Sequence, residues 1–311
     1  MSINTIEYAK IFVKALDEQL IAKATSGWME QNGGQLQYTG GNEVKIPKLQ
    51  LNGLGTYDRD NGFVQGAVTL TYETRLMTQD RGRTFQIDAM DVDETNFAAV
   101  AGDVMGQFQK TKVIPEIDAY RYSKIAELAE NMKKVSYYHP TKDSIVEKLL
   151  EEITIVKDIV GDENEIIITM SSKTANLLDM ASNHMLETGT FKQGNVTLNV
   201  KNIDGSPIIR VPSARLKTAY QFFDGTTTGE TEGGFEPTSD AKDINWIIAV
   251  RNAPIAVSKT DVTRIFDPMT NQKANAWKID YRKYHDLWIT DNAMDGIYVN
   301  IDGQAPTTKG E

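Results

Sequence analysis

The residues most able to carry acid–base or metal chemistry in this sequence are its three histidines. His139, His184 and His285 fall in three different predicted elements, and none has a second histidine one helical turn away, a common spacing of metal ligands. The sequence has no cysteine, which excludes thiolate nucleophiles, iron–sulfur clusters and cysteine-ligated zinc. The motifs GxxxxGKS/T, HExxH and GxSxG are also absent. We therefore expect no cofactor, no metal site and no enzymatic activity.

A short run of carboxylates is the next candidate for chemistry. Asp88, Asp91, Asp93 and Glu94 stand close together in the sequence. Paired carboxylates do acid–base work when an apolar pocket separates their pKa values. Here they stand where a helix is predicted to begin, and acidic groups interact favourably with a helix N-terminus. A structural role is expected. The alternative, a hydrolase, would require a concave pocket that shifts a carboxylate pKa.

Three arginines precede these carboxylates. Arg75, Arg81 and Arg83 fall within nine residues, and their guanidinium groups can bind carboxylates through two hydrogen bonds at once. One interpretation is local pairing on a solvated face, which stabilises little. The other is a latch between subunits, in which these arginines bind carboxylates of a neighbouring copy. The residues concerned in such a latch would be Arg75, Arg81, Arg83, Asp88, Asp91, Asp93 and Glu94.

Length and composition describe an ordinary globular protein. The chain has 311 residues, a mean hydropathy of -0.39 and a formal net charge of -10. The negative charge argues against a broad electrostatic surface for nucleic acid. The first residues do not resemble a signal peptide, and no apolar run approaches the ~20 residues of a membrane-spanning helix. We therefore expect a protein made and kept in a cytoplasm-like compartment, with no membrane partner.

The N-terminal third predicts a helix followed by extended strands. Apolar residues from Ile6 to Leu20 recur every three or four positions, which predicts an amphipathic helix, either packed on the core or serving as an arm on a neighbouring subunit. Alternating residues in 44–51, 68–76 and 84–88 predict strands, with a tight turn at Asp80-Arg81-Gly82. Such strands bury too little apolar surface to be stable alone, so they must lie on another surface.

The remaining sequence predicts a long helix and then a mixed α+β block. Helical spacing runs from about 91 to 134, where Pro115 should kink or divide the helix. Later signals predict a helix starting at Pro140-Thr141, a buried strand over 165–170, and a helix from Ser171 to Gly189. A polar, mobile loop is expected over 224–243. Strands are expected at 246–250, 255–257 and within 277–301.

The order of these parts resembles the major capsid (coat) protein of tailed bacteriophages, the Hong-Kong-97-type fold. Three segments carry the resemblance most specifically, being similar to coat proteins of phages of Gram-positive bacteria: DETNFAAVAGDVMGQFQKTKVIPEIDAYRYSKIAELA, AKDINWIIAVRNAPIAVSKTDVTRIFDP and AWKIDYRKYHDLWITDNAMDGIYVN. The resemblance implies an α+β fold with six parts. These are an N-terminal arm (1–40), an extended β-hairpin loop (41–90), the spine helix of a peripheral domain (91–138), an axial domain (139–256), returning peripheral strands (257–301) and a disordered tail (302–311).

The resemblance also implies a function and partners. Such proteins assemble as pentamers and hexamers into an icosahedral shell that encloses double-stranded DNA. The shell forms in the bacterial host cytoplasm and becomes the capsid of the virion. The short arm implies a separate scaffolding protein, and a portal is expected. Lys45 and Lys48 lie where some members cross-link subunits, but no acid for that chemistry is identified, and cross-linking is not expected. An encapsulin-like nanocompartment shell of the same fold is the alternative.

Overall fold

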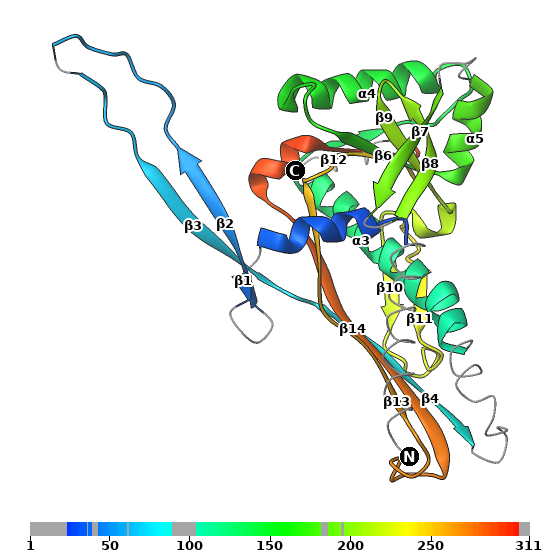
Figure 1. Cartoon of the computed structure of the whole chain (residues 1–311). Coiled ribbons are helices and arrows are strands. Elements are labelled where there is room, and N and C mark those ends of the chain that lie inside the picture. Colours follow the sequence, from blue (N-terminus) through cyan, green and yellow to red (C-terminus); the bar gives the residue numbers. More distant parts are fainter. Residues whose placement is uncertain are drawn as a thin grey trace, which may run out of the picture.

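The computed structural model describes residues 24–35, 37–38, 43–60, 62–88, 104–181, 186–193 and 196–304. Within these ranges, helices and strands build a body from which one β-ribbon projects and a long narrow sheet descends (Figure 1). The expected N-terminal helix, the carboxylates Asp91, Asp93 and Glu94, His184 and most of the C-terminal tail lie outside the described residues.

A seven-stranded mixed sheet forms the centre of the body. Its strand order is β5-β15-β12-β6-β9-β8-β7. The strands are β5 (Val135–Tyr137), β6 (Ile166–Ser171), β7 (Glu187–Gln193), β8 (Val196–Ile203), β9 (Ser206–Val211), β12 (Ile244–Val250) and β15 (Ile297–Ile301). The closing strand β15 therefore belongs to this sheet, between β5 and β12, and does not follow β13 and β14 into theirs.

The central strands of this sheet are buried on both faces, which explains their continuous apolar sequences. Ile166 and Ile168 of β6 pack with the helices α4 (Ile145–Val160) and α5 (Ser172–Ala181). Ile167, between them, packs on the opposite face with residues of α3 (Ile114–Asn131). Because successive side chains of a strand point to opposite faces, a strand covered on both sides needs an uninterrupted apolar run. The predicted strand over 165–170 is confirmed.

The long helix runs through residues 104–131 with a π-helical turn at η2 (Gln109–Val113). Pro115 lies in the first turn of α3, directly after this π-turn. The N–H of Ile114 donates to the carbonyl of Gln109, five residues earlier, so the helix widens just before the proline ring. The helix is not divided at Pro115, and the proline is accommodated by a local change of helix type.

A narrow three-stranded sheet descends from the body. It has the order β13-β14-β4, formed by β13 (Pro254–Phe266), β14 (Ala276–Ile289) and β4 (Gln79–Asp88). The tight turn expected at Asp80-Arg81-Gly82 is wrong, because these residues lie inside β4, paired with β14. A Cβ at Gly82 would lie 2.8 Å from the carbonyl oxygen of Tyr281. The glycine therefore serves close strand approach.

The polar segment after Phe223 is more regular than expected. β10 (Tyr220–Phe223) and β11 (Gly234–Pro237) form an antiparallel hairpin. The rings of Phe222 and Phe235 stack at 6.0 Å between centroids, and Phe222 also contacts the ring of Tyr120 on α3. The expectation of a mobile loop over 224–243 is therefore wrong for the part that forms β11.

The predicted start of the helix α5 is confirmed, whereas its predicted end at Gly189 is wrong. Ser171 begins α5 as expected, since its hydroxyl accepts a hydrogen bond from the Thr174 N–H. The described part of that helix ends at Ala181, and Gly189 lies in β7, where a Cβ would meet the Asn202 side chain at 2.2 Å. Short 3-10 turns, η1 (Gly27–Gln35), η3 (Ser213–Arg215) and η4 (Asp291–Gly296), complete the described body. The described helices include none with the length and apolar character needed to cross a bilayer.

Candidate intersubunit interface

The projecting ribbon (residues 43–76) consists of β2 (Glu43–Leu51), β3 (Val68–Leu76) and the segment between them. The short strand β1 (Gln37–Tyr38) pairs with the start of β2. Beyond its root the ribbon stands clear of the body (Figure 1).

The two faces of the ribbon differ sharply in polarity. The register pairs Leu49 with Leu70 and Leu51 with Val68, so these side chains share one face. Lys48, opposite Thr71, lies on the other face. We call the first set the apolar face; it comprises Pro47, Leu49, Leu51, Val68, Leu70, Tyr72 and Leu76. An amphipathic ribbon of this kind is typical of a strand pair with one face packed on a hydrophobic surface.

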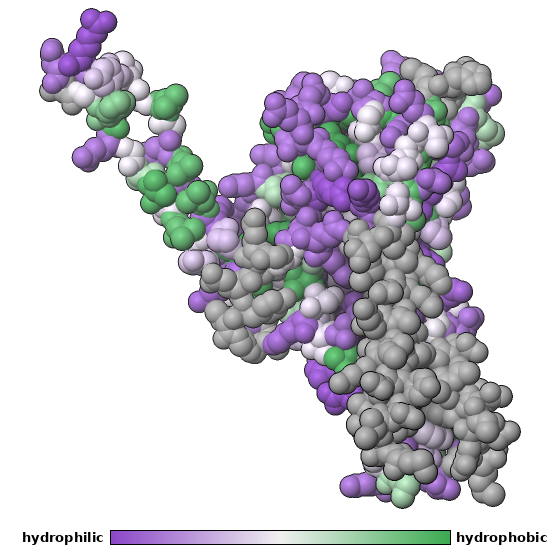
Figure 2. Space-filling view, in the orientation of Figure 1, coloured by the Kyte–Doolittle hydropathy of each residue, from purple (hydrophilic) through white to green (hydrophobic). Residues whose placement is uncertain are grey.

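The apolar face has no such surface within the described chain. Leu49 is 51% exposed, Leu51 64%, Val68 71% and Leu70 55%. Figure 2 shows these apolar residues as a patch along the ribbon, away from the body. Water-exposed apolar patches of this continuity mark interaction sites in folded proteins.

The root of the ribbon is packed firmly against the body. Val44 and Ile46 are buried against Tyr284 and Trp288 of β14, together with Met77. These buried side chains lie on the same face of β2 as Lys48, opposite the apolar face. The root therefore packs on the body through one face of the ribbon and leaves the apolar face uncovered.

Ion pairs reinforce this root. The Lys48 ammonium lies 2.7 Å from Asp291 and 3.3 Å from Glu73, and Arg75 donates to Glu73 at 2.9 Å. The hydrogen bond to Asp291 raises the pKa of Lys48, and the same bond lowers the pKa of Asp291. Lys48 and Arg75, predicted as interface residues, therefore have carboxylate partners within their own chain. Lys45 lies in β2 opposite Thr74 and is half-buried.

A buried carboxylate fixes the junction between the ribbon and β4. Asp286 accepts hydrogen bonds from the Thr78 N–H at 2.8 Å and the Thr78 hydroxyl at 3.0 Å. Its second oxygen accepts from the Tyr120 hydroxyl at 2.6 Å. Burial, followed by the charge of Asp286, raises the pKa of Tyr120, so this phenol remains a donor. One side chain thus connects ribbon, long helix and β14.

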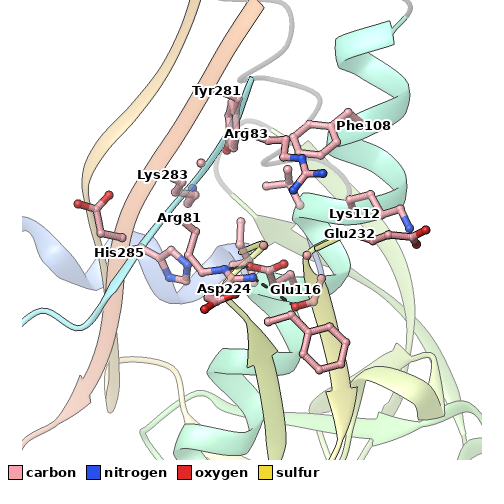
Figure 3. A pocket seen from close by; sticks show the side chains of 18 of the residues that line it. Arg81, Arg83, Phe108, Lys112, Glu116, Asp224, Glu232, Tyr281, Lys283 and His285 are labelled. Atoms are coloured by element: carbon pink, nitrogen blue, oxygen red, sulfur yellow. Dashed lines mark hydrogen bonds and ion pairs between the residues drawn. The ribbon is translucent and has the colours of Figure 1, made fainter. Parts of the chain in front are cut away.

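The other two predicted arginines lie farther along β4. Arg81 forms an ion pair with Glu116 of α3 and donates to the Gly234 carbonyl at 3.2 Å. Arg83 donates to the Thr231 carbonyl at 3.3 Å. Figure 3 shows both guanidinium groups between β4, the long helix and the β10–β11 hairpin. Asp88 ends β4 opposite Ala276, apart from both arginines in the register.

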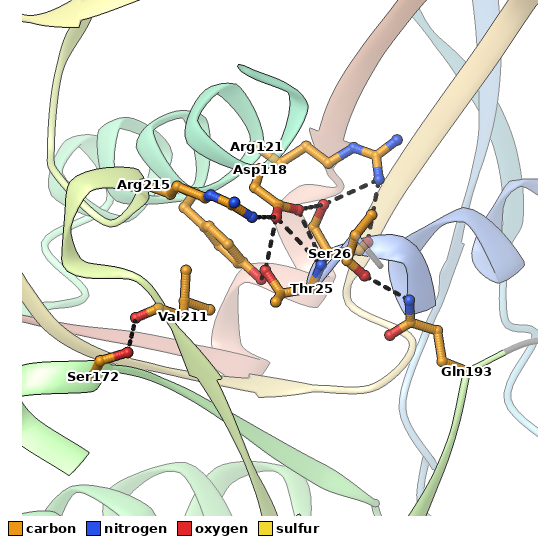
Figure 4. A network of polar contacts seen from close by, with 10 residues as sticks. Thr25, Ser26, Asp118, Arg121, Ser172, Gln193, Val211 and Arg215 are labelled. Carbon is orange, nitrogen blue, oxygen red and sulfur yellow. Dashed lines mark hydrogen bonds and ion pairs between the residues drawn. The ribbon is translucent and has the colours of Figure 1, made fainter. Parts of the chain in front are cut away.

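A polar network that sequence reasoning missed holds the point where the N-terminal segment meets the body. The buried Asp118 accepts hydrogen bonds from the N–H and hydroxyl groups of Thr25 and Ser26, at 2.7 to 3.3 Å (Figure 4). The fully buried Arg121 donates to the Ser26 carbonyl at 3.2 Å. Asp118 and Arg121 are three positions apart on α3. Their partners are more than ninety residues away in the sequence, so no local sequence pattern predicts these hydrogen bonds.

The two described histidines have different environments. His139 lies 2.8 Å from Asp302 at the surface. His285 is buried edge-on to the ring of Tyr120, and its Nδ1 has no hydrogen-bond partner among the described residues. Burial, together with the charges of nearby arginines and lysine, holds the pKa of His285 well below its usual value.

Comparison with known proteins supports the fold at the level of structure. No protein-family model and no curated protein matches the sequence. The capsid structure of Staphylococcus phage Andhra matches with a TM-score of 0.54 and 11% identity, covering 86% of this chain and 82% of that one. The capsid structure of the cyanophage P-SCSP1u matches with a TM-score of 0.53 and 9% identity, covering 86% of each chain. A structure from Gordonia phage Cozz matches with a TM-score of 0.53 and 14% identity, over 85% of this chain and 82% of that one.

These likenesses cover more than four-fifths of the chain. At identities of 9–14%, these matches establish the fold alone. The predicted resemblance is confirmed at that level: the chain has the α+β fold of bacteriophage capsid proteins.

Proposed function

We propose that this chain is the major structural subunit of a phage or prophage shell, which assembles as pentamers and hexamers into an icosahedral container for double-stranded DNA. The observation that carries the proposal is the exposed apolar face of the ribbon. A rigid root and an uncovered apolar outer part favour burial against a second copy. Obligate interfaces of this kind bury roughly 2,000 Å² or more.

The charge of the chain is compatible with this role. Its net charge is -10, so the packaged DNA would be enclosed without tight, sequence-specific binding. We further propose a separate scaffolding protein and a portal as partners, assembly in the host cytoplasm, and the virion as the final location. No enzymatic step is part of the proposal.

The domain assignment also stays a proposal. The long helix with β13 and β14 would form most of the peripheral domain (91–138 and 257–301), and the seven-stranded sheet with α4 and α5 most of the axial domain (139–256). Residues 1–40 would be the arm and 41–90 the extended loop. Because β15 lies in the larger sheet, the two proposed domains would share that closing strand.

Sedimentation and electron microscopy of the purified chain test the proposal. We expect pentamers, hexamers or closed shells, whose formation depends on protein concentration. A compact monomer at high concentration would contradict it. Shells of fixed small size that contain a cargo protein and have no portal would instead favour a nanocompartment.

A further inference from the structure

A lysine and an aspartate contact each other inside the narrow sheet. Lys283, on β14, is 3% exposed, whereas every other lysine among the described residues is at least partly exposed. Its ammonium lies 2.5 Å from the Oδ2 atom of Asp261, the residue directly opposite it on β13. The carboxyl carbon of Asp261 is one covalent bond beyond this oxygen. The amine nitrogen and that carbon are therefore close enough for one to attack the other.

The pair is poorly satisfied as an ion pair. The Asp261 side chain is 25% exposed, yet its Oδ1 atom is buried and has no hydrogen-bond partner among the described residues. Moving an ammonium and a carboxylate out of water costs free energy, and a buried carboxylate oxygen without a donor adds to that cost. A neutral amide between the two side chains would remove both charges. Burial therefore favours the amide over the ion pair.

A second carboxylate stands beside the lysine. Glu30 of η1 lies 3.9 Å from the Lys283 ammonium and 2.5 Å from the Arg121 guanidinium. Burial by itself would raise the pKa of Glu30, but the charges of Arg121 and Lys283 outweigh burial and hold that pKa below its usual value. Glu30 is therefore ionised and can accept a proton from the lysine. A carboxylate in this position can serve first as general base and then as general acid.

We propose that Lys283 and Asp261 condense into an amide bond that joins β13 to β14, with Glu30 as the proton-transfer group. Glu30 takes a proton from the Lys283 ammonium, and the amine that results attacks the Asp261 carboxyl carbon. A C–N bond forms and the C–O bond to one Asp261 oxygen breaks. That oxygen leaves as water with two of the three ammonium protons, and the third proton stays on the amide nitrogen. The reaction needs no oxidant, reductant or further reactant.

The bond would fix an irregular part of the sheet. β13 is an edge strand, paired only with β14, and its register shifts between Ser258 and Thr260. Asp261 is the residue directly after this shift. A covalent bond there would prevent β13 from slipping along β14. This inference goes beyond the proposed function and does not depend on whether copies of the chain assemble.

The root of the ribbon supplies a comparison within the same chain. Lys48 lies 2.7 Å from Asp291 and 3.3 Å from Glu73, so the same three kinds of side chain meet there. The Lys48 side chain is 20% exposed and the Asp291 side chain 50% exposed. Because water solvates both charges, an ion pair is stable at this site. We expect Lys48 and Asp291 to remain unlinked.

Mass spectrometry of the purified full chain tests the bond. We expect the parent chain to be lighter than its sequence mass by one water molecule. Trypsin should release residues 260–264 joined to residues 283–309, because an acylated Lys283 is no longer cleaved. This linked peptide distinguishes the bond from a loss of water elsewhere in the chain. Lys283→Arg keeps the positive charge and should give no linked peptide, and no peptide should link Lys48 to Asp291.

Glu30→Gln tests the proton transfer. This variant keeps a polar side chain beside Arg121 and should form the bond about 100-fold more slowly than the parent chain. Circular dichroism checks that it is folded. A linked peptide that forms equally fast in the folded variant would overturn the role of Glu30.

The parent chain alone decides whether the bond exists, even if Glu30→Gln does not fold. A folded parent chain that keeps its full mass after prolonged incubation, and releases residues 260–264 and 284–309 as separate peptides, would overturn the proposal. That result would leave the proposed function standing, since the proposed function is tested by assembly and not by mass.

Discussion

The apolar face of the ribbon should be needed for assembly and not for the stability of the single chain. Leu49 and Leu70 face each other across the two strands and are 51% and 55% exposed. Changing both to glutamine removes apolar surface that the described residues leave uncovered and that we propose a second copy covers.

The magnitude follows from the remaining exposure. Fully burying a leucine side chain stabilises by about 1.5–3 kcal/mol, so covering the exposed half of each contributes roughly 0.8–1.5 kcal/mol. For the pair this is about 1.5–3 kcal/mol per interface, or roughly a 10- to 150-fold weaker association. The free energy of unfolding of the single chain should change by about 0.5 kcal/mol or less, as for other exposed substitutions.

Two assays separate these effects. Sedimentation velocity over a concentration series measures association, and urea denaturation of the dissociated chain measures stability. Thr69→Gln with Thr71→Gln places the same polar side chains on the opposite face of the ribbon and serves as the control. The reasoning is refuted if the leucine variant associates as strongly as the parent, or if it loses stability and association together.

Substitutions at three residues test the body. Asp118→Asn keeps the shape of a buried acceptor but removes its charge, and should lower the free energy of unfolding by about 1–3 kcal/mol in urea titrations; an unchanged midpoint would contradict its role in holding the N-terminal segment. Arg81→Glu places a carboxylate opposite Glu116, and should lower the melting temperature of the single chain, whereas Arg81→Lys should lower it less. Because the pKa of His285 is depressed by folding, the unfolded state binds a proton that the folded state does not, so stability should fall by about 1 kcal/mol from pH 6.5 to 5.5. His285→Gln should lose less over that interval, and equal slopes for the two proteins would contradict this assignment.

Sequence patterns predicted those helices and strands whose formation depends on the periodicity of their own apolar residues. Alternation in 44–51 and 68–76 predicted the strands of the ribbon, and the apolar run at 246–250 predicted β12. The helical spacing after Val113 predicted α3. In each case the period of the apolar residues reflects the faces that the element buries.

The errors arose where a distant part of the chain decides the structure. Asp80-Arg81-Gly82 has the composition of a turn, but Gly82 is needed because Tyr281, far along the chain, passes close by. The segment after Phe223 is polar, yet the ring of Phe235 pairs it with β10. Only the fold reveals that Arg81 faces Glu116.

The candidate interface was predicted in part. The low apolar content of the predicted strands indicated that they need another surface to lie on. Which side chains of the ribbon are buried at its root depends on Tyr284 and Trp288 of β14, which lie far along the chain. The difference between Arg81 and Arg83 likewise depends on the hairpin and helix that surround them. The burial of the ribbon root and the environments of these two arginines are set by tertiary packing, which a local sequence pattern does not contain.

An electron cryomicroscopy map of the assembled protein, at a resolution that shows side chains, tests the central claim most directly. We expect the apolar face, from Pro47 to Leu76, to lie against atoms of another copy of the chain. Shells in which that face remains open to solvent, or a chain that stays monomeric at every concentration, would contradict the account.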